Sequence, residues 1–121
     1  MEKLLVFHLN ETELQKLRRI AGNLKIHYEI IEGTNYTQPI ENLLSGHLSP
    51  LIAPFTGELP QENLLLLCDF TEKRMDKLLL ALRRDQVMID YKAILTPTNR
   101  KWNAMRLFLE MQAEKAAYQN R

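Results

Sequence analysis

Cys68 and Arg74 have the spacing of a loop that transfers phosphoryl groups in tyrosine phosphatases. In such loops the cysteine thiolate attacks phosphorus, while the arginine six residues later holds the phosphate oxygens. Here the intervening residues 69–73 include two carboxylates and no glycine. Carboxylates would repel a phosphate, and without glycine the backbone cannot wrap closely around one. We therefore interpret Cys68 as a structural residue of a buried strand, and no residue of the chain is predicted to be catalytic.

A second group of polar residues lies near the C-terminus, where a strand is expected to lead into a helix. Residues 96–101 hold two hydroxyls, an amide and two cations around Pro97. Thr98 or Asn99 can cap the helix, whose first N–H groups carry partial positive charge. This pattern predicts a pocket for phosphate or carboxylate, formed by Lys92, Thr96, Thr98, Asn99 and Arg100. In the simpler alternative, Pro97 shapes the turn and Trp102 anchors a well-capped helix to the sheet.

The same stretch resembles a bacterial family known as domain of unknown function 3783. The family typically carries the motif Lys-Ala-hydrophobic-hydrophobic-Thr-Pro-Thr-Asn-x-x-Trp near its C-terminus. The matching residues of this chain are Lys92, Ala93, Thr96, Pro97, Thr98, Asn99 and Trp102. The resemblance covers about residues 59–115, and it implies no activity, cofactor or partner because the family has none assigned. This chain has Cys68-Asp69-Phe70 where the family would have a glycine in the turn.

Composition and motifs exclude several other classes of function. His8, His27 and His47 lack the spacing of metal ligands, and the chain has no glycine-rich phosphate loop or nucleophile elbow. We therefore predict neither a metal nor a cofactor. The net charge of +1 and the aromatic content of 7% argue against a nucleic-acid partner. The arginine pairs at 18–19 and 83–84 are expected near helix C-terminal ends, where they favour the helix dipole.

The chain is expected to be a single cytoplasmic domain over residues 1–121. Apolar residues make up 45% and charged residues 26%, which is an ordinary globular mixture. The apolar run at residues 4–7 is too short for a signal peptide, and no run approaches the ~20 residues of a membrane span. The single cysteine fits a reducing compartment.

The elements that would position these residues follow a repeat with an offset of 61 residues. Leu65-Leu66-Leu67 aligns with Leu4-Leu5-Val6, and Thr71 aligns with Asn10 as a helix cap. Each copy has an apolar run, a polar turn, an amphipathic stretch and a second apolar run, which predicts strand, helix and strand. The predicted segments are a first β-α-β unit at 1–32, an irregular connection at 33–62, a second β-α-β unit at 63–95, and a turn with a C-terminal helix at 96–121.

Two segments lie outside the β-α-β units. In the connection, one short helix is expected around residues 40–44, with Pro39 before it and Gly46 after it. The rest of the connection is a flap over a sheet edge, or alternatively a lid or docking surface. The final helix is expected at about 100–118, with one face made by Trp102, Met105, Leu109, Ala113 and Ala116.

These elements predict the α+β class. We favour two split β-α-β repeats that form a ferredoxin-like two-layer sandwich, with helices on one face and an added C-terminal helix. The alternative is a three-layer α/β fold with a fully parallel sheet and helices on both faces.

The expected function is that of a non-enzymatic binding or regulatory module. It would dock a protein partner or self-associate through the connection, the final helix or both. Leu107 and Met111 are the candidate surface, because the final helix carries more apolar residues than one buried stripe needs. The alternative is a protein that binds a small anion or a nucleotide phosphate at residues 96–101.

Overall fold

The computed structural model describes residues 1–119, and residues 120 and 121 of the predicted final segment lie outside the described residues. It has a mixed α+β structure with a four-stranded open sheet and, within those residues, four α-helices. The elements are β1 (Lys3–Phe7), α1 (Glu11–Leu24), β2 (Tyr28–Ile31), the 3-10 helix η1 (Gly33–Asn35), α2 (Ile40–Ser45), β3 (Leu64–Cys68), α3 (Glu72–Arg84), β4 (Tyr91–Ile94), the 3-10 helix η2 (Asn99–Lys101) and α4 (Ala104–Gln119).

The sheet joins two β-α-β units through their first strands. Its order is β2-β1-β3-β4. β2 is parallel to β1 and β4 is parallel to β3, whereas β1 and β3 are antiparallel. The α+β class is therefore confirmed, but the split arrangement is corrected because the two strands of each unit are adjacent. The alternative is wrong in its fully parallel sheet, since the central pair is antiparallel, but right in placing helices on both faces of the sheet. Apolar patterning predicts where strands occur in the chain. It does not indicate whether the two strands of a β-α-β unit are neighbours in the sheet or have another strand between them.

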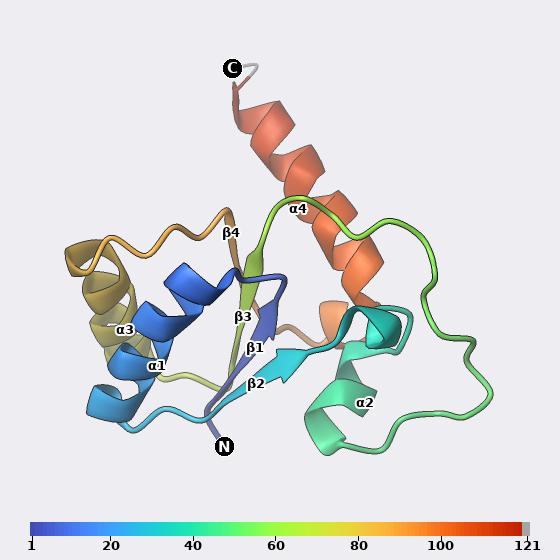
Figure 1. The fold of residues 1–121 in the computed structure, drawn as a ribbon, viewed down its shortest axis with the longest axis horizontal. Helices are drawn as coiled ribbons and strands as arrows, with labels where there is room; N and C mark the ends of the chain where they lie inside the picture. The colour runs from blue at the N-terminus through green and yellow to red at the C-terminus, as the bar shows by residue number, and fades with distance from the viewer. Residues whose placement is uncertain (120–121) are drawn as a thin grey trace.

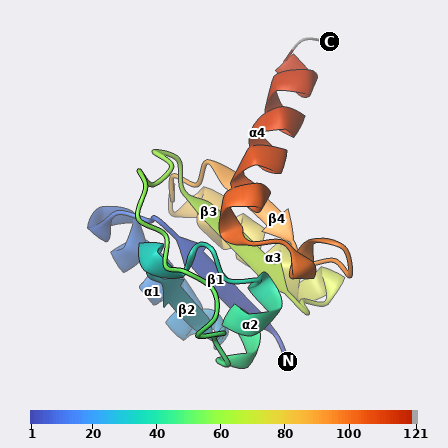
Figure 2. The same cartoon turned by 90° about the vertical axis from the view of Figure 1, so that its right-hand side faces the viewer.

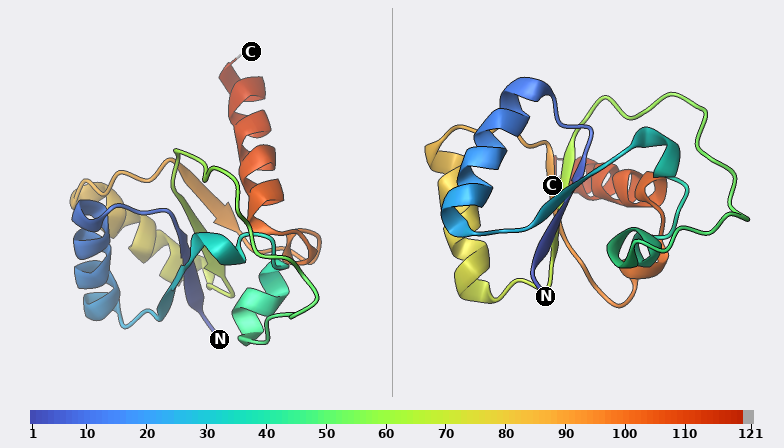
Figure 3. Two further views of the ribbon diagram at one scale, coloured as in Figure 1. Left: turned by 45° about the vertical axis from the view of Figure 1, so that its right-hand side comes forward. Right: turned by 60° about the horizontal axis from the view of Figure 1, so that its bottom comes forward.

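Helices cover both faces of the sheet (Figure 1). Leu65 and Leu67 of β3 pack with α1 and α3, whereas Leu64 and Leu66 pack with α2 and α4. Figure 3 (right) shows the sheet between these two helical layers. The expected two-layer arrangement is thus wrong, for a simple reason. Consecutive strand residues point to opposite faces, so an uninterrupted apolar run needs a cover on each side.

Corresponding turns of the two units have the same conformation. The side chain of Asn10 accepts a hydrogen bond from the N–H of Glu13 at 2.9 Å, and Thr71 accepts one from Arg74 at 3.2 Å. Both predicted caps are therefore confirmed. Positive φ angles follow the same offset, at His8 (65°) and Asp69 (59°) where strand leads to helix. Lys25 (56°) and Gln86 (54°) repeat it after the helices.

The connection between the units is tied down by one buried amide. The predicted short helix is confirmed as α2, and Gly46 ends it with a φ of 75°. Gln38, which is 5% exposed, then holds the returning chain. Its Nε2 donates to the carbonyl of Ser49 at 2.9 Å, and its Oε1 accepts from the N–H of Ser49 at 3.0 Å. The N–H of Phe55 donates to the carbonyl of Thr34 at 2.9 Å, so residues 49–55 fold back against η1 and the residues that precede α2.

The C-terminal helix begins later than expected and turns a different face to the sheet. Asn103, rather than Thr98 or Asn99, caps it by accepting from the N–H of Arg106 at 2.9 Å. Its buried residues include Leu107 and Phe108, whereas Leu109 is 63% exposed. The face predicted from Trp102 onwards is right only at its start, because Trp102 and Met105 pack against the core. Its other members, Leu109, Ala113 and Ala116, are exposed, since Ala104, Leu107 and Phe108 form the side toward the sheet. Figure 2 shows that the C-terminal half of α4 projects beyond the sheet.

No helix within residues 1–119 is both long and apolar enough to cross a bilayer.

Candidate functional site

β4 is an edge strand whose outer side is open. The N–H groups of Tyr91 and Leu95 donate to the carbonyls of Asn63 and Leu67, at 3.2 and 2.9 Å. Since successive residues of a strand direct their backbone groups to opposite sides, those of Lys92 and Ile94 face outward. The side chain of Ile94 is 53% exposed. This edge therefore presents backbone donors and acceptors next to an exposed apolar side chain.

One end of the β4 edge is closed by Asn99, which is 7% exposed. Its Nδ2 donates to the outward carbonyl of Ile94 at 2.9 Å, and its Oδ1 accepts from the N–H of Thr96 at 2.8 Å. The N–H of Asn99 in turn donates to Thr96 Oγ1 at 3.0 Å. The amide thus joins the strand to the turn that follows it.

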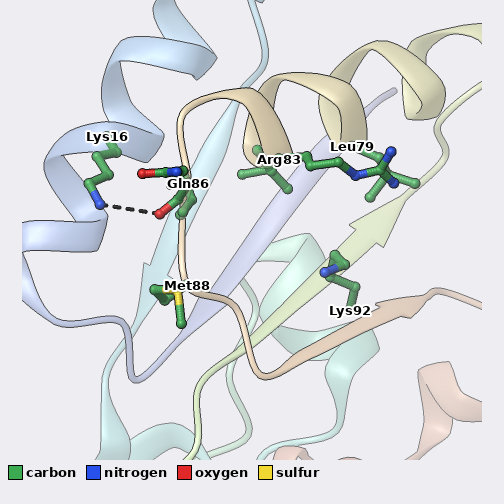
Figure 4. A pocket seen from close by; sticks show the side chains of 8 residues that line it. Lys16, Leu79, Arg83, Gln86, Met88 and Lys92 are labelled. Atoms are coloured by element: carbon green, nitrogen blue, oxygen red, sulfur yellow. Dashed lines mark hydrogen bonds between the residues drawn. The ribbon is translucent and has the colours of Figure 1, made fainter.

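Of the five residues predicted for an anion pocket, Lys92, Thr96 and Asn99 border one pocket of about 330 Å³, whereas Thr98 and Arg100 do not line it. Thr96 and Asn99 meet, but their backbone and side-chain groups are engaged with each other. The N–H of Arg100 donates to Thr96, and the exposed side chains of Thr98 and Arg100 lie on the same turn. The side chain of Lys92 is directed toward α3, near the opposite end of β4 (Figure 4). The main-chain N–H groups of Thr96, Asn99 and Arg100, which an anion pocket would need, therefore form hydrogen bonds within the turn.

Lys92 instead borders a groove of about 670 Å³ beside α3, here called the α3-side groove (Figure 4). The N-terminal unit contributes Lys16, whose Nζ donates to the carbonyl of Gln86 at 3.2 Å. The lining residues are Lys16, Leu79, Leu82, Arg83, Gln86, Val87, Met88 and Lys92. They comprise four apolar side chains, three cations and one amide, with no carboxylate among them.

The cations of the α3-side groove are only partly neutralised. Lys16 lies 3.4 Å from Glu13, and that carboxylate also accepts from the N–H of Met88 at 2.8 Å. Among the described residues, no carboxylate lies within ion-pair distance of Arg83 or Lys92. The groove therefore presents uncompensated positive charge above an apolar floor.

A second depression follows the other face of β4, here called the α4-side groove. It consists of two adjoining pockets of about 620 and 330 Å³, which share Lys92, Met111 and Glu114. Its lining residues are Asp90, Tyr91, Lys92, Ala93, Ile94, Thr96, Asn99, Trp102, Leu107, Glu110, Met111, Glu114, Lys115 and Tyr118. The projecting half of α4 forms one wall and the β4 edge forms the other.

The two residues predicted for a partner surface both border the α4-side groove, but of the two only Met111 is partly exposed. Leu107 is 2% exposed and lies in the core between α4 and the sheet, so that part of the prediction is corrected. Met111 is partly buried and borders the α4-side groove. Trp102 also lies partly buried against the core, and the guanidinium of Arg106 sits 4.5 Å from the centroid of its ring. Pro97 lies in the exposed turn.

Cys68 and Arg74 do not form a phosphate-binding loop. Cys68 is 1% exposed on β3, and burial raises the pKa of its thiol to about 12. Arg74 is held elsewhere, because its guanidinium donates to both oxygens of the Glu2 carboxylate at 2.8 and 3.1 Å. A protonated, buried thiol cannot act as the nucleophile such a loop requires.

Within residues 1–119, no three His, Cys, Asp or Glu side chains are grouped to hold an ion.

Sequence reasoning missed several residues that line the two grooves beside β4. Lys16 comes from the first unit, and Tyr118 comes from the far end of α4. Arg83 was interpreted only as a helix-end cation. The alternation of buried and exposed residues in β4 was an available signal, since Lys92 and Ile94 share one face. Nothing in the sequence showed that this strand lies at an edge.

Residues 63–118 match the model of a family described as domain of unknown function (DUF3783). The match confirms the resemblance predicted from the stretch at 92–102. It runs from the start of β3 almost to the end of α4, so it includes the β4 edge and the α4-side groove. No curated protein and no solved structure matches the chain.

Proposed function

We propose, from the premise that residues 63–118 belong to the DUF3783 family, that the chain is a non-enzymatic binding module that docks a protein partner along the β4 edge. We place it in the bacterial cytoplasm, because the motif at residues 92–102 resembles that of a bacterial family and a single unpaired cysteine suits a reducing compartment. Its role is regulatory, exerted through the partner that it binds.

The observation that carries this proposal is the open edge of β4 between two grooves. An edge strand with free backbone groups is a template for pairing with another chain. The α3-side and α4-side grooves lie on the two faces of this one strand, and Lys92 borders both. A partner segment beside β4 would therefore find backbone groups in the plane of the sheet and room for side chains above and below it.

The family motif supports the same location. Ala93, Thr96, Asn99 and Trp102 belong to the motif and line the α4-side groove. Asn99 blocks the carbonyl of Ile94 and so limits how far a docked segment can extend toward the turn. The motif thereby shapes the surface at which the partner would bind.

Site-specific photocrosslinking in cells tests the proposal. A benzophenone amino acid replaces Ile94, which is 53% exposed on the edge, or Leu80, which is 63% exposed on α3 and borders neither groove. We expect an adduct with one other protein from position 94 and no such adduct from position 80. Mass spectrometry of the adduct would identify the partner residue beside β4.

A proline at Lys92 provides the blocking variant. The main-chain N–H of Lys92 faces outward in the wild type. Lys92→Pro therefore removes no hydrogen bond to β3, but it obstructs the pairing of another strand at the edge. We expect Lys92→Pro to abolish the adduct from position 94, and Lys92→Ala to separate the loss of charge from the loss of the backbone donor. Identical adducts from positions 94 and 80, or none from either, would refute docking at this edge. An adduct with a second copy of the chain would replace the partner with self-association.

A further inference from the structure

Resting on the proposed function, we infer the chemistry of the partner segment. It is an extended peptide that adds to β4 as a fifth strand and alternates acidic with apolar side chains. Its carboxylates face the cations of the α3-side groove, and its apolar side chains enter the α4-side groove.

The backbone of β4 supports strand addition over a short stretch. The outward groups still available are the N–H and C=O of Lys92 and the N–H of Ile94, since Asn99 occupies the carbonyl of Ile94. A neighbouring strand in either direction can use these three groups. Main-chain hydrogen bonds of this kind provide affinity, while the pockets for alternate side chains provide specificity.

The α3-side groove selects negative charge. Lys16, Arg83 and Lys92 border it, and its lining includes no acidic residue. The nearest carboxylate in contact with these cations is Glu13, which is 7% exposed and bonded to Lys16 and to the backbone of Met88. Carboxylates from a docked strand would pair with Arg83 and Lys92, which have no acidic partner within the described residues.

The α4-side groove favours the apolar side chains of the docked strand. Its lining carries the carboxylates of Asp90, Glu110 and Glu114 and the cations of Lys92 and Lys115. Negative charge therefore exceeds positive charge, which disfavours acidic side chains on this face. Lys115 lies 5.8 Å from the centroid of the Tyr91 ring, and Glu110 pairs with Arg106 at 3.8 Å. Met111, which is partly buried, and Ile94, which is 53% exposed, line this groove and offer apolar surface to apolar side chains.

The same charges argue against a second copy of the chain pairing β4 with β4. Antiparallel pairing about a two-fold axis perpendicular to the sheet keeps equivalent faces together, so Arg83 and Lys92 of one copy would approach the same cations of the other. Like charges at this spacing repel, whereas an acidic strand would relieve that repulsion. Charge complementarity therefore favours an acidic partner over self-pairing.

Fluorescence anisotropy with designed peptides tests the inference. The probe is a fluorescein-labelled peptide of about seven residues that alternates glutamate and valine. One control replaces every glutamate with lysine, and a second keeps the composition but separates glutamates and valines into two blocks. We expect the alternating acidic peptide to bind at least about tenfold more tightly than either control, and to weaken between about 0.05 and about 0.5 M salt.

Matched variants of the protein locate the binding. Arg83→Glu with Lys92→Glu should weaken the acidic peptide by more than about tenfold, because two pairing charges become repulsive. The control is Lys73→Glu with Lys77→Glu, which makes the same charge change on exposed residues of α3 outside both grooves. Ile94→Pro should weaken binding by about tenfold while Ile94→Val does not, since only proline removes the outward donor.

The outcomes distinguish this inference from the function on which it rests. Equal binding of all three peptides, or equal weakening by both charge-reversal pairs, would overturn the acidic strand. If the position-94 crosslink nevertheless forms and Lys92→Pro removes it, docking at the edge stands with a partner of other chemistry. Sedimentation that shows a dimer dissolved by Ile94→Pro would assign the edge to a second copy and would also overturn the inference.

Discussion

The side-chain amide of Asn99 donates a 2.9 Å hydrogen bond to the main-chain carbonyl of Ile94, five residues earlier in the chain. Its oxygen simultaneously accepts from the N–H of Thr96 at 2.8 Å. A single buried side chain thus ends the open part of the β4 edge and shapes the turn that leads to α4. The turn at residues 96–101, which was predicted to bind an anion, is thus hydrogen-bonded to the edge of the sheet.

Replacing Asn99 with alanine should destabilise the fold without touching the cations of the grooves. The Thr96 N–H and the Ile94 carbonyl would both lose their partner, which we expect to lower the free energy of unfolding by about 2–3 kcal/mol. Urea titration followed by circular dichroism measures this. Thr98→Ala is the control, because Thr98 is exposed and its hydroxyl makes no hydrogen bond in the described structure. An equal effect of the two substitutions would show that the Asn99 bonds contribute nothing.

Glutamate at Leu107 should prevent folding, whereas glutamate at Leu109 should not. Leu107 is 2% exposed in the core beneath α4, and Leu109 is 63% exposed on the same helix. Burying an unpaired carboxylate among apolar side chains costs more than about 4 kcal/mol, while an exposed site tolerates it. Thermal unfolding of both variants provides the comparison. A well-folded Leu107→Glu protein would contradict the placement of this residue in the core.

The Cys68 thiol should make the protein less stable as the solution becomes alkaline. Burial raises its pKa from an ordinary 9.0 to about 12, so the unfolded chain loses this proton first. The stabilisation from the native thiol is present below pH 9 and declines between pH 9 and about 12. Burial likewise raises the pKa of Tyr36 to about 12, which adds to the decline above pH 10.

Denaturation at pH 8 and pH 10 isolates the Cys68 contribution. The wild type should lose about 1 kcal/mol more between these pH values than Cys68→Ala, because alanine has no proton to release. The native thiol should also resist alkylation at pH 8 until denaturant is added. The same pH slope in both proteins, or rapid alkylation of the native state, would contradict a buried protonated thiol.

Replacing Gln38 with alanine should release the connection between the two units. Both hydrogen bonds to Ser49 and the bond that Asn42 Nδ2 makes to Gln38 Oε1 at 3.3 Å would be lost. Because Gln38 is buried, we expect a loss of about 1–3 kcal/mol and faster proteolysis within residues 47–57. Limited proteolysis with mass mapping measures the cleavage sites. Gln61→Ala is the matched control, because Gln61 is an exposed amide of the same connection whose side chain makes no hydrogen bond in the described structure. Cleavage unchanged from wild type would show that other contacts hold the segment.

Helix caps and helix ends could be predicted from the sequence because they depend on residues that are close together in the chain. Asn10 and Thr71 were correctly predicted as helix caps, since a side chain and an N–H three residues later are necessarily close. Gly46 was correctly placed after α2 because a left-handed residue commonly ends a helix. The site residues were harder, because Lys16, Arg83 and Lys92 meet only where α1, α3 and β4 pack together.

The sequence by itself determined the two β-α-β units and the long apolar runs of their first strands. Only the tertiary structure decided that β1 and β3 pair antiparallel, with Leu5 opposite Leu66, and that β4 is left as an edge. An apolar run specifies burial on both faces but not which strand becomes its neighbour. That choice depends on contacts between residues far apart in the chain, and the same choice leaves Lys92 and Ile94 facing outward.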